Sequence, residues 1–236
     1  MTPVNKKWEY VTPWSIKEAI SIALIYFLLW LLITFVLSKL LRAMPVSVHA
    51  FGDTMIALGS LSLLIICLIW LIFIKRGSLI TIGIVKCKLL YYIYAPACAI
   101  GLYFALESLL EFLSITQITP SFEKGFSVLH CLNATVFVPI SEEVYFRGIL
   151  FSACKKQLGL HIGVIVSALL FGLIHLNIHY PALWYISMLS PVLCGITFAS
   201  LFHYSKSLLP AIVCHSVFNL MVTFQQSGII ILRPMQ

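Results

Sequence analysis

Apolar residues run through this chain in long stretches, and polar residues gather between them. A membrane-spanning helix needs about 20 mainly apolar residues, and seven stretches of this kind occur. We therefore expect an all-α, multipass transmembrane helical bundle of about seven spans, within a range of six to eight. The expected spans are residues 16–38, 54–74, 89–115, 127–152, 161–176, 183–203 and 208–226.

The overall composition agrees with a membrane protein. Of 236 residues, 61% are hydrophobic and only 10% are charged, whereas soluble domains are about half apolar and a quarter charged. The single aspartate, Asp53, excludes mechanisms that need two aspartates. The seven cysteines are scattered without a CxxC pair, so we expect them to be buried small hydrophobes. No basic cluster is interleaved with aromatic residues, so no nucleic-acid partner is expected.

The polar stretches suggest how the chain is organised and oriented. We expect an N-terminal segment 1–15, N-terminal membrane helices 16–115, a membrane core 127–226 and a tail 227–236. With a cytoplasmic N-terminus, ten Lys and Arg residues fall inside and four outside, which favours that orientation in a cell membrane. The inside group is Lys6, Lys7, Lys17, Lys75, Arg76, Lys86, Lys88, Lys155, Lys156 and Lys206; the outside group is Lys39, Arg42, Lys124 and Arg233.

Three charged residues lie inside the fourth expected span. Each charge at the centre of a bilayer costs roughly 2.5–3.5 kcal/mol or more, so such residues face the protein interior and mark function. Glu143 and Arg147 are four residues apart and can form an ion pair on one helix face. Glu142 points about 100° away and lacks such a partner, which makes it the better candidate for a chemically active carboxylate. Pro139 breaks a backbone hydrogen bond just before the pair.

Further polar groups occur in two later spans. His175 ends the fifth span, and His215 shares a helix face with Asn219 in the seventh. A Glu and a His can activate a water as general base, and His with Asn can supply donors to an oxyanion. Two His and one Glu are equally a ligand set for Zn²⁺. A bound divalent metal held by Glu142, His175 and His215 therefore stays open, as does a purely structural network bracing the bundle.

Read in order, these residues resemble the CPBP family of intramembrane proteases, which includes CAAX prenyl endopeptidases and bacteriocin-processing (Abi) proteins. The family signatures EExxxR, FxxxH and HxxxN match Glu142–Arg147, Phe171–His175 and His215–Asn219. The resemblance implies a peptidase, working either with a bound metal or without one, and a hydrophilic chamber inside the membrane. It implies that Glu142 and His175 activate the water and that His215 and Asn219 stabilise the oxyanion. Glu143 and Arg147 would hold the geometry of this site.

Two other classes compete with an endopeptidase that cleaves a membrane-associated peptide or protein. Intramembrane Glu, His and Arg also build the proton relays of transporters, although no inverted repeat is visible here. A non-catalytic membrane scaffold or immunity protein is the other alternative. All three motifs are intact, which favours the enzyme.

Overall fold

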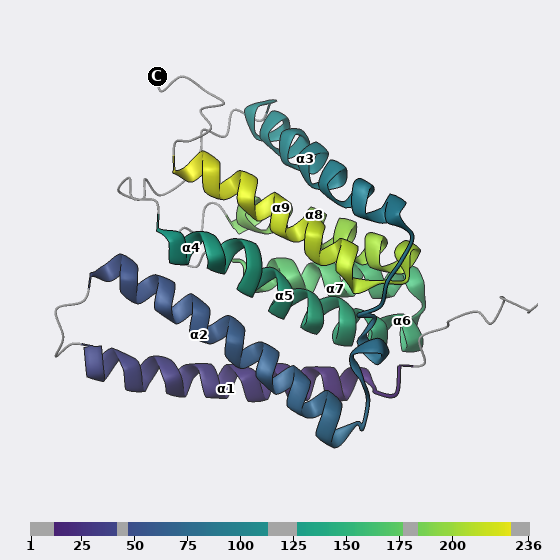
Figure 1. Cartoon of the computed structure of the whole chain (residues 1–236), viewed down its shortest axis with the longest axis horizontal. Helices are drawn as coiled ribbons and strands as arrows, with labels where there is room; N and C mark the ends of the chain where they lie inside the picture. Colours follow the sequence, from purple (N-terminus) through teal and green to yellow (C-terminus); the bar gives the residue numbers. More distant parts are fainter. Residues whose placement is uncertain (1–11, 42–46, 113–126, 177–183, 228–236) are drawn as a thin grey trace, which may run out of the picture.

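The computed structural model describes residues 12–41, 47–112, 127–176 and 184–227, and these residues form helices without a β-strand. The long helices pack side by side along one axis (Figure 1). The prediction of an all-α bundle is therefore confirmed. The helices are α1 (Ile16–Leu41), α2 (Val48–Ile69), α3 (Leu89–Phe112), α4 (Val128–Leu132), α5 (Val138–Glu143), α6 (Ser152–Leu158), α7 (Leu160–Ile174), α8 (Trp184–Ser205) and α9 (Leu208–Gln226).

Helices α4, α5 and α6 follow one another without a break, and we call residues 128–158 the central helix. Two π-helical segments, Asn133–Phe137 and Val144–Phe151, join its three parts. Widened π turns of this kind are frequent at functional sites. The second segment begins directly after the two glutamates.

Five described helices are long and apolar enough to cross a membrane. They correspond to five of the seven predicted spans, and α2 is extended to Ile74 by a further π segment. The other two predicted spans are the central helix, which carries the charges, and α7, which has only 15 residues. The chain is thus a multipass membrane protein. The predicted terminal segments 1–15 and 227–236 lie mostly outside the described residues.

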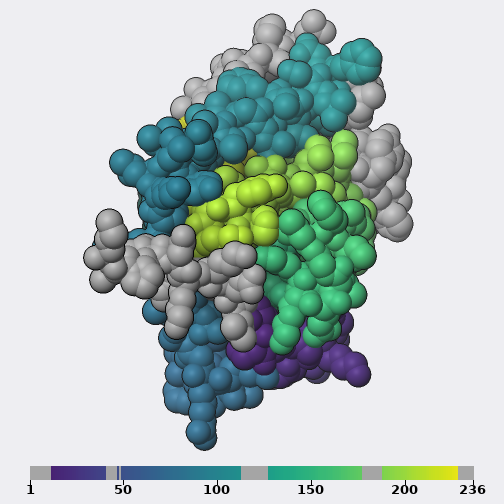
Figure 2. All heavy atoms as spheres, turned by 90° about the vertical axis from the view of Figure 1, so that its right-hand side faces the viewer, coloured from purple at the N-terminus to yellow at the C-terminus, as the bar shows by residue number. Residues whose placement is uncertain are grey.

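The bundle has two ends that differ in charge. We call the end where α1, α3, α7 and α9 begin the basic end; it lies on the right of Figure 1. Lysine and arginine gather in the segments that meet there. Figure 2 looks onto this end, where the turn after α6, the turn before α9 and the loop before α3 come together. The basic residues in these segments and beside them are Lys17, Lys75, Arg76, Lys86, Lys88, Lys155, Lys156 and Lys206.

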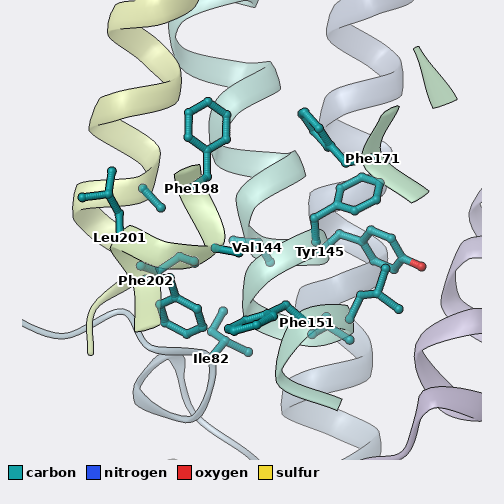
Figure 3. Packing of buried hydrophobic residues seen from close by; sticks show 14 of the residues in the cluster. Ile82, Val144, Tyr145, Phe151, Phe171, Phe198, Leu201 and Phe202 are labelled. Atoms are coloured by element: carbon teal, nitrogen blue, oxygen red, sulfur yellow. The ribbon is translucent and has the colours of Figure 1, made fainter. Parts of the chain in front are cut away.

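A packed apolar cluster fills the interior near the basic end (Figure 3). Ile82, from the loop before α3, is 1% exposed and packs on Gly148 of the central helix. A Cβ added to Gly148 would lie 3.2 Å from the Cβ of Ile82. The next residue, Gly83, has a φ of +88° and lies against Phe202, where a Cβ would be 2.4 Å from the ring. Only glycine fits both the left-handed backbone and this contact. The carbonyl of Gly83 accepts a 2.7 Å hydrogen bond from Leu208 N, which fixes the loop across the end of the bundle.

Small residues also bring α7 and α8 close together. A Cβ on Gly172 would meet Val192 at 2.4 Å, and one on Gly195 would meet Ala168 at 2.9 Å. Membrane helices approach closely through such glycines. The contact places the Gly195 backbone next to the charged part of the central helix.

Candidate active site

Glu143 is the centre of a buried charge network. Its Oε1 accepts a hydrogen bond from Arg147 Nη1 at 2.8 Å and lies 2.9 Å from Nδ1 of His215 on α9. A carboxylate oxygen can only accept, so His215 carries its proton on Nδ1. The three residues are 0%, 1% and 3% exposed. The predicted Glu143–Arg147 ion pair is therefore confirmed, and it extends to a histidine from a distant helix.

Aromatic rings and a backbone carbonyl surround Arg147. Its Nη2 donates to the Gly195 carbonyl at 3.3 Å, across the close α7–α8 contact. The guanidinium carbon lies 4.4 Å from the ring centre of Phe171 and 5.0 Å from that of Phe198. Cation–π contacts of this kind are stronger away from water. Phe198 also stacks on the His215 ring at 4.7 Å, so the same two rings hold the arginine and the histidine.

Glu142 has a different environment from its neighbour. Its side chain is 16% exposed, and its Oε2 faces His215 Nε2 at 3.9 Å, which is too long for a hydrogen bond. That Oε2 is buried and has no hydrogen-bond partner among the described residues. The prediction that Glu142 lacks a partner in its own helix is therefore confirmed. His215 lies between the two carboxylates, with one nitrogen bound to Glu143 and the other facing Glu142.

His175 lies at the edge of this arrangement. It follows the last turn of α7, and its side chain is exposed. Its Nδ1 donates to the Phe171 carbonyl at 2.7 Å, and its ring packs on Phe171 at 4.6 Å. In the described structure no hydrogen bond or ion pair joins His175 to Glu142. The Phe171 ring, 5.9 Å from that of His215, separates the two predicted histidines.

Asn219 binds the backbone of the central helix. Its Nδ2 donates to the Ala134 carbonyl at 2.9 Å. Val138 N bonds five residues back, to Asn133, and the same register would pair residue 139 with Ala134. Pro139 has no N–H to donate, so Asn219 supplies the missing donor. The break predicted at Pro139 is present, and a side chain from α9 satisfies the carbonyl that it exposes.

The predicted metal ligands do not form a metal site in this arrangement. Among the described residues, no group of three or more His, Cys, Asp or Glu side chains lies close enough to hold an ion. Glu142 and His215 face each other, but His175 is turned to a backbone carbonyl and is exposed. The Arg147 cation beside them also disfavours a second positive charge. As placed, these side chains do not fit a bound divalent metal.

Three further residues contribute to the site without a strong sequence signal. Gly195 offers a carbonyl and Phe198 a ring, and neither function can be read from an apolar helix. Tyr26 of α1 lies near enough to Glu142 for the two to interact electrostatically. Its hydroxyl is 3.4 Å from the place of a Cβ on Gly59. Only contacts between helices identify these residues.

A buried Glu–His–Arg network thus lies inside the membrane bundle, next to a carboxylate oxygen that has no hydrogen-bond partner among the described residues. Residues 124–221 match the family model described as Type II CAAX prenyl endopeptidase Rce1-like. The match covers somewhat less than half of the chain and agrees with the resemblance to CPBP intramembrane proteases seen in the motifs. Searches of curated proteins and of solved structures gave no match.

Proposed function

We propose that the protein is an endopeptidase that cleaves a membrane-associated or hydrophobic peptide, with Glu142 activating the attacking water. The observation that carries this proposal is the contrast between the two glutamates. Glu143 binds both Arg147 and His215 through its Oε1, and only its Oε2 has no partner in the part of the chain that the structure describes. No hydrogen bond to the Glu142 side chain is present among the described residues, and its Oε2 faces Nε2 of His215 at 3.9 Å. A carboxylate that is not needed to hold the fold is available for proton transfer.

These positions support the following proposed reaction. A water bound between Glu142 Oε2 and His215 Nε2 gives its proton to Glu142, and its oxygen attacks the carbonyl carbon of the peptide. When His215 carries protons on both nitrogens, Glu143 compensates its charge, and Nε2–H can donate to the oxyanion. The C–N bond then breaks, and Glu142 returns the proton to the leaving amine. Arg147 stays paired with Glu143 throughout.

His175 and Asn219 have conditional roles in this proposal. Each now binds a backbone carbonyl, of Phe171 and Ala134 respectively. To assist Glu142 or the oxyanion directly, each side chain would have to leave that carbonyl when substrate binds. His175 is the more easily released, because it is exposed at the end of α7.

The experiment compares the peptides of membranes and medium from cells that express the wild type, Glu142→Gln or His215→Ala. Glu111→Gln is the matched control, because Glu111 is an exposed carboxylate in α3. We expect the same uncleaved precursor to accumulate in both site variants and not in the control, at equal protein levels. Full activity of a folded, membrane-inserted Glu142→Gln variant would refute the proposal.

A structural scaffold would need the Glu143–Arg147–His215 network but not Glu142. If deletion of the protein and His215→Ala have an effect in cells but Glu142→Gln does not, the scaffold is the better reading. A prenylated CAAX peptide, supplied in proteoliposomes, tests whether the substrate class in the family description applies to this chain.

We also propose that the N-terminus is cytoplasmic. Among the described residues, the basic end of the bundle, where α1 begins, carries eight Lys and Arg residues and one acid, Glu18. The opposite end carries Lys39 with Asp53, Glu107 and Glu111. Lys and Arg accumulate on the cytoplasmic side of membrane proteins, so the basic end faces the cytoplasm.

A further inference from the structure

The single aspartate of the chain, Asp53, joins α2 to the start of the central helix. Its Oδ2 accepts a hydrogen bond from Ser127 Oγ at 2.8 Å, and its Oδ1 lies 3.0 Å from Nδ1 of His130. Its backbone carbonyl accepts a third bond, from Nδ2 of Asn133 at 2.7 Å. Asp53 is 8% exposed and Asn133 is 1% exposed. One residue of α2 thus holds three residues of a neighbouring helix, and we call these four residues the Asp53 cluster.

The partners of Asp53 follow one another at a spacing of three residues, so they lie along one face of the helix. Ser127 is also the N-cap residue of α4, and its Oγ accepts a hydrogen bond from His130 N at 3.2 Å. A carboxylate oxygen can only accept, so His130 carries a proton on Nδ1. The Asp53 cluster therefore fixes the first turns of the central helix against α2.

The cluster ends where the backbone pattern of the central helix changes. Asn133 is the first residue of a π segment, and its carbonyl accepts from Val138 N, five residues further on. The next carbonyl, that of Ala134, accepts from Asn219 Nδ2 at 2.9 Å. This part of the central helix lies between α2 and α9 (Figure 1). Its position is therefore set by Asn133 on the side of α2 and by Ala134 on the side of α9.

Asn133 is an unusual choice for a buried position between helices. Burying an amide costs stability unless its polar groups are hydrogen-bonded. The bond to Asp53 satisfies Nδ2, whereas Oδ1 is buried and has no hydrogen-bond partner among the described residues. Leucine has a similar size and would avoid this cost. The position that Asn133 gives to the helix explains its presence better than a gain in stability does.

We propose that Asp53 and Asn133 are positioning residues for Asn219. They hold the Ala134 carbonyl where it binds the Asn219 amide, and they thereby orient Asn219 on the face of α9 that also carries His215. The inference rests on the proposed peptidase function and adds to it two residues that act through the central helix. When either bond to α2 is lost, the Ala134 carbonyl moves relative to α9, and Asn219 loses its fixed orientation.

The first test observes the Asn219 side chain without using activity. The chain has four asparagines, so protein labelled with ¹⁵N only at asparagine side chains gives four carboxamide signals in detergent micelles. The signals of Asn133 and Asn219 are assigned by their loss in Asn133→Leu and Asn219→Ala. Nuclear magnetic resonance then gives the chemical shift of the Asn219 amide and the rate at which its protons exchange with solvent.

The variants remove one bond of the cluster at a time or several together. Asp53→Ala removes the bonds to Ser127 and His130, and Asn133→Leu removes the bond to the Asp53 carbonyl. Ser127→Ala is a milder variant that removes one bond to Asp53. Thr135→Val is the matched control, because the Thr135 hydroxyl in the same π segment donates to a carbonyl of its own helix.

We expect the Asn219 signal to shift and its protons to exchange faster in Asp53→Ala and Asn133→Leu. The effect should be smaller in Ser127→Ala and absent in Thr135→Val. An unchanged Asn219 signal in the folded variants would overturn the inference, and so would an equal change in Thr135→Val. If the two stronger variants do not fold, the comparison of Ser127→Ala with Thr135→Val decides.

The second test is kinetic and uses, in proteoliposomes, the precursor that accumulates with Glu142→Gln. A misplaced Asn219 should lower kcat by up to roughly 100-fold with little change in KM. A merely structural role of Asp53 and Asn133 would leave kcat per folded molecule unchanged, and this result would contradict the inference. If no precursor accumulates, the proposed function fails, while the Asn219 signal still decides whether the Asp53 cluster positions this side chain.

Discussion

The two parts of the central helix, Val128–Glu142 and Glu143–Phe151, differ more than their sequences suggest. The first is partly exposed and ends on a carboxylate without a hydrogen-bond partner at Oε2, and the second is buried at every residue. Adjacent glutamates consequently have different environments, because Glu143 binds Arg147 and His215, while Glu142 makes no such hydrogen bond and its side chain is 16% exposed. At this boundary between a partly exposed and a buried part of one helix, Glu142 can react while the next residue, Glu143, holds the structure.

The largest expected effect on the free energy of unfolding comes from replacing Arg147, the cation in the buried part Glu143–Phe151. Arg147→Met leaves Glu143 buried with an uncompensated charge, so we expect a loss of about 3–5 kcal/mol in the free energy of unfolding. Lys39→Met, an exposed cation in α1, should change stability by less than about 0.5 kcal/mol. Unfolding by SDS titration in mixed micelles measures both. Similar stability of the two variants would mean that the Glu143–Arg147–His215 network does not stabilise the buried part of the central helix.

The two glutamates give the most direct test of the comparison. Glu143→Gln weakens hydrogen bonds to both Arg147 and His215, and we expect it to lose about 2–3 kcal/mol of stability. Glu142→Gln removes a carboxylate whose Oε2 has no partner, so its stability should stay within about 0.5 kcal/mol of wild type or rise. Both should lose peptidase activity. Equal destabilisation by the two substitutions would remove the distinction between a structural and a reactive carboxylate.

The stability of the protein should be sensitive to small changes in packing at the basic end of the bundle. Gly83→Ala places a Cβ against Phe202 in a left-handed backbone, and we expect a loss of about 1–3 kcal/mol. Gly101→Ala in α3 is the matched control, because no atom lies within 4 Å of its new Cβ. It should be neutral or gain about 0.5–1 kcal/mol. A neutral Gly83→Ala variant would show that the loop before α3 is not tightly packed, and melting curves in detergent would reveal this.

The sequence alone predicts the parts of the site that depend on a single helix. Hydrophobic runs locate the long helices, and a spacing of four predicts the Glu143–Arg147 pair. Contacts between helices were not predictable in the same way. The Gly195 carbonyl and the Phe198 ring reach the site only because small residues let α7 and α8 approach. The separation of His175 from Glu142 depends on where α7 ends.

For Asn219, the sequence motif predicts the helix face correctly but does not predict the hydrogen-bond partner. Its spacing from His215 places both on one face of α9, as predicted. Its partner, Ala134, is exposed by a π turn and by Pro139 on another helix, and neither signal points to α9. The predicted role at the oxyanion and the observed bond to Ala134 can be separated by experiment.

A double-mutant cycle on Asn219 and Pro139 separates the oxyanion role of Asn219 from its bond to Ala134. It has the smallest expected effect on stability. Asn219→Ala leaves the Ala134 carbonyl without its donor and should lose about 1–2 kcal/mol of stability. Pro139→Ala restores a backbone N–H that can bind this carbonyl, so the loss should shrink in that background, with a coupling of about 1 kcal/mol. SDS titration of the four proteins gives the cycle, and additive effects would mean that Asn219 does not replace the donor that proline lacks. If the double variant regains stability but not activity, Asn219 also acts on the substrate, and α9 then carries a second functional side chain beside His215.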